Sequence, residues 1–233
     1  YVRRAAPYST KSINSHPTQL SILIVECYNR DGRERLKSVG VRRASDTFAS
    51  LLHKMTPDNH DMDIEFIQPA DSSSHVAEVG ELGRFDGVVW TGSALTIHSG
   101  TPEVERQIEL ARRIFEAGVP QYGSCWGLQI SAAAAGLPLE ANPKGREHGV
   151  ARSITLTPDG LRHPMFDGTM CKFDGLAAHT DHVASDWALS PVCPPGVSAQ
   201  ILASNGWSPV QALSVRVGWG EFWSVQYHPE LSL

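Results

Sequence analysis

The chain has 233 residues, of which 41% are hydrophobic and 19% are charged, and its net charge is −5. This balance is typical of a globular protein and excludes a disordered or fibrous chain. The sequence has no apolar run of about 18 residues, so we expect no membrane span, and its acidity argues against nucleic-acid binding. Four scattered cysteines without a C-x-x-C pair favour a reducing, cytoplasmic compartment over a disulfide scaffold.

Positive charge is concentrated near the N-terminus. Residues 1–54 contain 10 Lys and Arg against 4 Asp and Glu, whereas residues 55–233 contain 10 against 21. This distribution is typical of a solvated basic segment, and it also fits a basic surface that meets an anionic ligand or partner. The first residues lack the apolar stretch of a signal peptide, and the missing initial Met suggests a trimmed chain.

In chain order, the first half alternates strands and helices. Residues 1–20 are polar and predict a flexible arm, and residues 21–233 are expected to form a single domain. Apolar runs predict strands, and apolar residues at helical spacing predict helices. The charged stretch 29–43, with two glycines, predicts a loop. Strands are expected at residues 21–26, 62–68, 87–90 and 119–122, and helices at residues 44–55, 102–117 and 126–135.

The pattern changes from Gly149 onward to short strands between turns rich in Pro and Gly. These strands are expected at residues 151–157, 171–178, 200–204, 210–215 and 222–227. The alternation in the first half implies a parallel sheet with right-handed crossovers. We therefore predict an α/β fold with a mostly parallel central sheet and flanking helices, to which the C-terminal half adds antiparallel strands.

The motif with the clearest chemistry is Gly123-Ser124-Cys125-Trp126-Gly127, between the fourth predicted strand and a predicted helix. A sharp strand-to-helix turn strains the backbone of its central residue and requires neighbours without bulk. The helix dipole there favours the thiolate of Cys125, and the N–H of Trp126 is placed to receive an oxyanion. A buried cysteine in a glycine-rich turn is the structural alternative.

A second motif, Gln226-Tyr227-His228-Pro229-Glu230, ends the last predicted strand. His228 and Glu230 are two residues apart, so on an extended chain both side chains point to the same side. A carboxylate beside an imidazole fixes its tautomer and supports its charge as the base of a nucleophile. Together with the cysteine motif, this pair predicts a catalytic triad.

These two motifs resemble the class I, triad-type glutamine amidotransferases, with the amidotransferase part of GMP synthase and its free-standing relatives as the nearest type. Two more segments agree with the resemblance, namely residues 145–149 (GREHG) and 178–183 (AHTDHV). The similarity spans about residues 21–230, and the four motifs come in the order that the family has. The resemblance implies a flavodoxin-like amidotransferase fold and no cofactor.

Residue by residue, the resemblance implies that Cys125 is the nucleophile, His228 the general base and acid, and Glu230 its orienting carboxylate. Gly92 and Ser93, with the N–H of Trp126, correspond to the oxyanion hole of the family. The positions that match its substrate-binding residues are Gln129, Glu147, Thr180, Asp181 and His182.

The sequence departs from the family pattern in three places. Ser93-Ala94 stands where the loop often continues Gly-Pro, Ala178 replaces the usual Ser, and the chain stops three residues after Glu230, where relatives usually continue. His179, Asp181 and His182 suggest a metal site, but this short loop offers no further ligand nearby, so we expect no metal.

Three functions follow from the resemblance. The first is hydrolysis of the glutamine side-chain amide through a Cys125 thioester, with ammonia passed to a synthetase partner or missing domain. The second is the same chemistry on γ-glutamyl peptides or amines. The third is a non-catalytic regulatory subunit on this fold. The basic stretch 30–43, with Arg33, Arg35 and Lys37, is a hypothetical docking surface for the partner.

Overall fold

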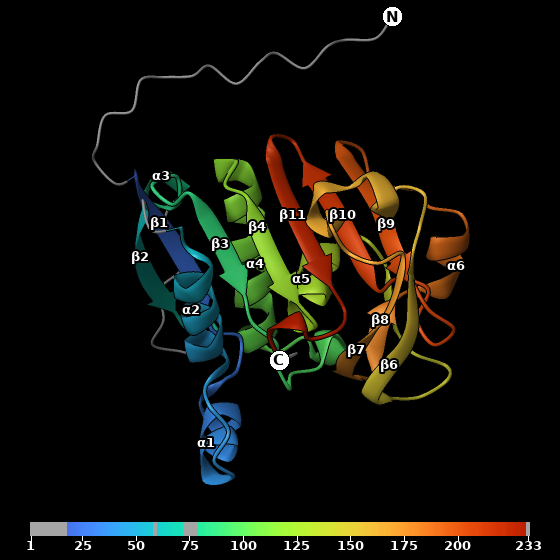
Figure 1. Ribbon diagram of the computed structural model, residues 1–233, viewed down its shortest axis with the longest axis horizontal. Coiled ribbons are helices and arrows are strands. Elements are labelled where there is room, and N and C mark those ends of the chain that lie inside the picture. The colour runs from blue at the N-terminus through green and yellow to red at the C-terminus, as the bar shows by residue number, and fades with distance from the viewer. Residues whose placement is uncertain (1–17, 58–59, 72–78, 232–233) are drawn as a thin grey trace, which may run out of the picture.

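Residues 18–57, 60–71 and 79–231 are described in the structure, a computed structural model (Figure 1). They include a sheet of nine strands in the order β2-β1-β3-β4-β11-β10-β9-β6-β7. β1 (Thr18–Val25), β2 (His60–Ile67), β3 (Gly87–Trp90) and β4 (Gln121–Ser124) are parallel, and β11 (Gly220–Val225) pairs parallel with β4. The predicted mostly parallel α/β fold is thus confirmed.

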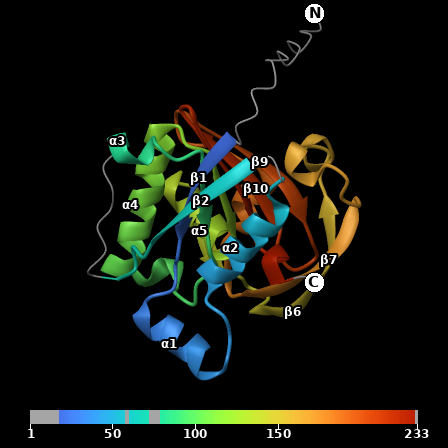
Figure 2. The ribbon, with the colours of Figure 1, turned by 60° about the vertical axis from the view of Figure 1, so that its left-hand side comes forward.

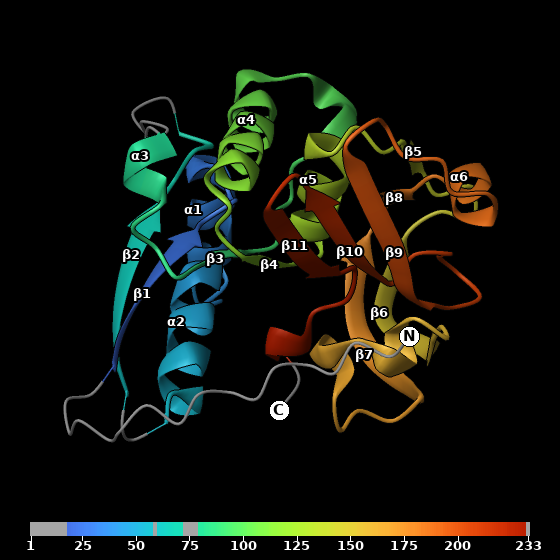
Figure 3. The same ribbon diagram turned by 90° about the horizontal axis from the view of Figure 1, so that it is seen from above.

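Helices cover both faces of the parallel strands. α2 (Ala44–Met55) packs Phe48 near Ile24 on one face, whereas α4 (Pro102–Ala117) and α5 (Trp126–Ala134) lie on the other (Figure 3). Successive strand residues point to opposite faces. A strand that is buried on both sides therefore needs a continuous apolar run, which is the pattern that the sequence shows in β1.

The longest described helix, α4, begins and ends where its sequence predicts. Pro102 occupies its first turn, and Gly118, with φ 70°, ends it in the left-handed conformation that glycine adopts without strain. Thr101 is the N-cap residue, but its side chain makes no capping hydrogen bond and lies 3.2 Å from the Ser99 hydroxyl instead. None of the described helices is long and apolar enough to cross a membrane.

The C-terminal half adds antiparallel strands beside β11. These strands are β10 (Ala212–Val217), β9 (Val197–Ser204), β6 (Glu147–Leu156) and β7 (Lys172–His179), and they enclose a second apolar cluster. A separate antiparallel pair is formed by β5 (Leu139–Ala141) and β8 (Asp181–Val183), and two short helices are α3 (Val79–Leu82) and α6 (Ser185–Leu189).

The prediction of a loop over residues 29–43 was wrong. Residues Arg30–Ser38 form helix α1, which projects beyond the strand ends (Figure 1). Asn29 caps it by accepting a hydrogen bond from the N–H of Gly32 at 2.9 Å. The helix buries none of its residues completely, so the apolar spacing that predicts a helix is weak there. The predicted arm, residues 1–20, lies mostly outside the described residues, and β1 begins at Thr18.

Candidate active site

Cys125 stands on a strained turn between β4 and α5. Its φ is 51° and its ψ −96°, a conformation that costs a non-glycine residue about 1–3 kcal/mol. The flanking glycines allow the turn, because a Cβ on Gly123 would lie 2.8 Å from the Cα of Gly127. The Cys125 N–H donates to the Val225 carbonyl at 2.7 Å, which ties the turn to β11.

The imidazole of His228 and the carboxylate of Glu230 form a close pair, with 2.7 Å between Nδ1 and Oε1. The prediction that they share one side of an extended chain was wrong in its geometry. β11 ends at Val225, and Pro229–Leu231 form a short 3-10 turn that brings the two side chains together. The His228 N–H donates to the Leu176 carbonyl at 2.7 Å, which fixes this turn against β7.

Electrostatics couple His228 to the cysteine. Burial by itself lowers the pKa of His228, but hydrogen bonds with Cys125 and Glu230, and their negative charges, raise that pKa to about 10. The imidazole is therefore protonated at neutral pH and lies beside Cys125. By contrast, burial raises the pKa of the other buried thiol, Cys27, which stays protonated and unreactive.

Ser124 adds a contact that the sequence analysis did not foresee. Its hydroxyl donates to Oε1 of Glu230 at 2.9 Å, the same oxygen that faces His228. Oε2 of Glu230 is buried without a hydrogen-bond partner among the described residues. One carboxylate oxygen thus carries the contacts that orient the imidazole.

Gly92 follows β3 and lies close to both His228 and Cys125. A Cβ at this position would be 3.0 Å from Cε1 of His228 and 4.0 Å from Cβ of Cys125, so any larger residue would press on the imidazole. The next residue, Ser93, donates from its hydroxyl to the Cys27 carbonyl at 3.0 Å and accepts from the N–H of Leu95. These bonds fix the loop beside the sulfur although it lacks the Gly-Pro of the family pattern.

A cavity of about 270 Å³ opens at Cys125. Cys125 and Trp126 line this cavity. So do four further residues that were predicted to contact the substrate or the oxyanion: Ser93, Gln129, Thr180 and Asp181. Gln129 is buried and donates to the Asp181 carbonyl at 3.1 Å, which joins α5 to the first residue of β8. Helix α5 and the turn from β7 into β8 therefore form two walls of the cavity.

The side chains of Glu147 and His182 do not line this cavity. Glu147 binds Nε2 of His179 at 2.8 Å and accepts from Asn205 and Gln211, both at 2.7 Å. Burial alone would raise the pKa of Glu147, but these hydrogen bonds hold it below its ordinary value. Glu147 thus supports His179, which does line the cavity.

His182 is buried and does not line the cavity. It contacts the Ser208 hydroxyl at 3.1 Å and Glu140 at 3.2 Å, and its burial lowers its pKa. Its backbone belongs to β8, which follows the cavity loop. Among the described residues, no group of three or more His, Cys, Asp or Glu is placed to hold a metal ion.

A family model named glutamine amidotransferase class-I matches residues 50–233. The chain belongs to this family. It is 33% identical over 217 residues to a γ-glutamyl-L-1-hydroxyisopropylamide hydrolase of a Pseudomonas species, a match that covers 92% of this chain and 68% of that protein. It is 31% identical over 145 residues to a GMP synthase of Clostridium novyi, covering 62% of this chain but only 24% of the synthase.

Solved structures agree with this assignment at the level of the fold. A glutamine amidotransferase from Thermotoga maritima superposes with a TM-score of 0.65 at 14% identity, over 91% of this chain and 77% of that chain. The protein is thus an enzyme of the glutamine amidotransferase type, with the family's α/β fold.

Six cavity residues of this amidotransferase were missed as site residues, among them the polar side chains of Thr96, Arg146 and His179. Arg146 stands inside the predicted GREHG motif, so its position was visible, but a single charged residue on a turn gives no sign of which way its side chain points. Thr96 belongs to no motif and enters the cavity only because the loop after β3 folds over α5.

Proposed function

We propose that the protein hydrolyses the side-chain amide of glutamine with Cys125, His228 and Glu230 as its catalytic triad. The observation that carries this proposal is the coupling of His228 to Cys125 on one side and to Glu230 on the other. The three residues come from the carboxyl ends of two parallel neighbours, β4 and β11. Substrates of open α/β sheets bind at this edge.

The first half of the reaction forms a thioester. The Cys125 thiolate attacks the carboxamide carbon, and the N–H of Trp126 and the Gly92–Ser93 loop receive the charge on the oxygen, as preorganised donors do in acyl transfer. The protonated His228 gives its proton to the nitrogen, the C–N bond breaks, and ammonia leaves. Glu230 holds the imidazole in position throughout.

The second half regenerates the enzyme. His228, now neutral, takes a proton from water, and the hydroxide attacks the thioester carbon. The C–S bond breaks, glutamate leaves, and the thiolate again faces a protonated imidazole. No group outside the described triad is needed for this balance of atoms.

Recognition of the γ-glutamyl part is proposed for the cavity at Cys125. Gln129 and the backbone of Thr180 and Asp181 offer polar groups along its walls, and Arg146 offers a positive charge for a carboxylate. Glu147 supports this cavity through His179. His182, with its bonds to Ser208 and Glu140, is proposed to fix the loop and not to touch substrate.

The test measures ammonia released from glutamine by the isolated chain. The variant Cys125→Ala should lose at least about 10⁴-fold in kcat, since members of a triad act as a unit. Cys171→Ala, which alters an exposed thiol, is the matched control and should match the wild type. Mass spectrometry of the wild type should find a glutamate-sized adduct on Cys125. A Cys125→Ala variant with undiminished turnover would refute the triad.

Hydrolysis of other γ-glutamyl amides is a second candidate function. The relative from Pseudomonas that is named for such a hydrolase covers 92% of this chain. The same thioester would form, and an amine would leave in place of ammonia. A non-catalytic regulatory role is disfavoured, because the cysteine, imidazole and carboxylate are all present and coupled.

We further propose that the ammonia is used by a synthetase on another polypeptide or region, as the match to GMP synthases suggests. The exposed Arg35 and Lys37 of α1 are available for docking, but Arg33 is not, because it pairs with Asp71 at 2.6 Å. Addition of the synthetase part of a GMP synthase should stimulate glutamine turnover, and the double reversal R35E/K37E should reduce that stimulation. Unchanged turnover would reject this partner.

A further inference from the structure

A second cavity, of about 540 Å³, is lined by His228 and Glu230 but not by Cys125. Its other lining residues come mainly from the segment that joins α1 to α2 and from β6 and β7. Figure 2 shows the course of these segments. Ala178 lines both this cavity and the one at Cys125, and a Cβ on Gly92, which lines the second cavity, would lie 3.0 Å from Cε1 of His228 and 4.0 Å from Cβ of Cys125. The two spaces therefore adjoin at the reacting groups.

The walls of this second cavity are mostly apolar. Val41, Leu176 and Leu231 keep 51%, 38% and 52% of their surface exposed, which leaves apolar area without a partner among the described residues. Glu230 is the one acidic residue of the lining, and it is engaged by His228 and Ser124. Arg42 adds a positive charge. A cationic group would thus meet no free carboxylate and two positive charges, those of Arg42 and of the protonated His228.

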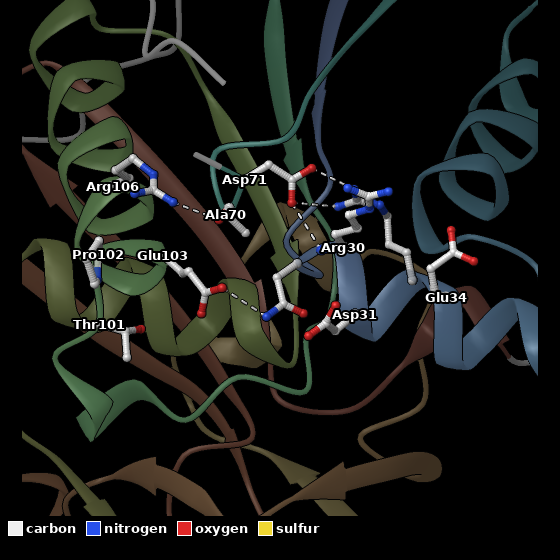
Figure 4. Close-up of a pocket in the computed structure, with 11 residues that line it drawn as sticks. Arg30, Asp31, Glu34, Ala70, Asp71, Thr101, Pro102, Glu103 and Arg106 are labelled. Atoms are coloured by element: carbon white, nitrogen blue, oxygen red, sulfur yellow. Dashed lines mark hydrogen bonds and ion pairs between the residues drawn. The ribbon is translucent and has the colours of Figure 1, made fainter. Parts of the chain in front are cut away.

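Helix α1 is anchored at its N-terminal end, and the N–H of Val41 donates to the Leu36 carbonyl at 2.9 Å, which ties the cavity wall to the helix. Figure 4 shows the anchor between α1, the end of β2 and the start of α4. Asp71 accepts from the N–H of Arg30 at 3.1 Å and pairs with the guanidinium of Arg33, and Asn29 donates to Glu103 at 3.0 Å. A preformed cavity of this kind binds without the entropy cost of ordering a loop.

Reaction geometry determines which part of a substrate reaches this space. If the γ-glutamyl part fills the cavity at Cys125, the amide nitrogen must face His228, which protonates it. A substituent on that nitrogen then extends past the imidazole, because the cysteine side is occupied. The second cavity begins there.

We propose that this second cavity, lined by Val41, Leu176 and Leu231, is a leaving-group site. It selects γ-glutamyl amides whose nitrogen carries an uncharged, apolar substituent. This inference rests on the proposed thioester mechanism and extends it from ammonia to larger leaving groups. The Cys125–carbon bond forms, the carbon–nitrogen bond breaks, and His228 supplies the proton with which the amine departs. Water then cleaves the thioester, so each turnover gives one glutamate and one amine.

Three substrates that share the γ-glutamyl part and differ only in the group on the amide nitrogen test the proposal. They are glutamine, γ-glutamyl-isobutylamide and γ-glutamyl-4-aminobutylamide. The isobutylamide should be cleaved with a kcat/KM at least about tenfold above that of the cationic aminobutylamide, since placing a charge in an apolar site is costly. Equal values for the two amides, or a preference for the cationic one, would overturn the proposal.

The variant Val41→Glu places a carboxylate in the cavity wall. Its ratio of kcat/KM for the isobutylamide to that for the aminobutylamide should fall at least about tenfold. Val39→Glu is the matched control, because Val39 lies two residues away, is 73% exposed and does not line the cavity. That ratio should stay within about twofold of wild type in the control. The same fall in both variants, or in neither, would contradict the assignment of this wall.

The outcomes separate this inference from the proposed function. Glutamine hydrolysis with no detectable cleavage of the isobutylamide refutes the leaving-group site and keeps the triad mechanism. Failure of all three substrates, with no adduct on Cys125, refutes the mechanism itself. Val41 and Val39 are both exposed, so circular dichroism should find each variant folded like the wild type.

Discussion

The cavities on the two sides of the Cys125–His228 pair differ in chemistry. The cavity at Cys125 is walled by Gln129, Arg146 and the polar segment 179–181, whereas the cavity beside His228 is walled mainly by aliphatic side chains, with Arg42, His228 and the engaged carboxylate of Glu230 as its charged groups. Polar groups at fixed positions discriminate strongly between ligands, whereas an apolar wall discriminates by size and charge. We infer that the first cavity recognises a constant γ-glutamyl part and the second a variable amine.

The largest effect is expected where the two cavities meet. His228→Asn removes the proton donor and should reduce kcat by about 10⁴-fold for glutamine and alkylamides alike. Initial rates with both substrates measure this loss. A loss confined to alkylamides would mean that His228 only shapes the amine side.

Gly92→Ala should have the next largest effect. The new Cβ would lie 3.0 Å from Cε1 of His228, so the ring must shift, and misplacement of a catalytic group costs up to about 10²-fold. The loss should appear in kcat for both substrates. Gly206→Ala is a control, because a Cβ there meets nothing within 4 Å and the φ is not positive. An unchanged kcat in Gly92→Ala would show that the site tolerates the shift.

Glu147→Gln tests the γ-glutamyl side alone. Loss of the charge that holds His179 should raise KM roughly tenfold for every γ-glutamyl substrate while kcat changes little, so the ratio between amides should not move. Glu140→Gln alters the similar pair with His182 outside the cavity and should leave KM near wild type. A KM change for only one amide would contradict the assignment of γ-glutamyl recognition to the first cavity and amine recognition to the second.

The same variant carries a pH signature. Because the pKa of Glu147 is lowered in the folded state, its stabilisation is present above its ordinary value of 4.5 and is lost as the pH falls through the lowered pKa. The denaturant concentration at which half of the protein is unfolded should therefore change less between pH 7 and pH 3 for Glu147→Gln than for the wild type. Equal acid sensitivity in the two proteins would contradict this account.

The smallest effect is expected for Ser124→Ala. Because the pKa of His228 is raised from 6.5 to about 10, its protonated form persists at neutral pH and is lost as the pH rises through about 10. Without the Ser124 hydroxyl, Glu230 is held less firmly against the imidazole, so kcat should fall several-fold and the alkaline limb of its pH profile should move to lower pH. Ser131→Ala removes a buried hydroxyl that does not contact Glu230 and should leave that limb in place.

Local sequence predicted most elements because their signals are local. The apolar runs of β1 and β3 and the glycine that ends α4 work through neighbouring residues and required no knowledge of the rest of the chain. Helix α1 was missed because its few apolar residues are not buried, and tertiary anchors at Asp71 and Glu103 hold it in place.

The sequence by itself determined the turn at Cys125, since a Cβ on Gly123 would lie 2.8 Å from the Cα of Gly127, four residues away. It also determined the family and the triad candidates. Only the tertiary structure decided that β11 lies parallel beside β4, which brings residues more than a hundred positions apart to one edge. It likewise decided that a 3-10 turn, and not an extended strand, joins His228 to Glu230, and that an apolar space lies behind them. Such arrangements depend on contacts between distant segments, which no short window of sequence contains.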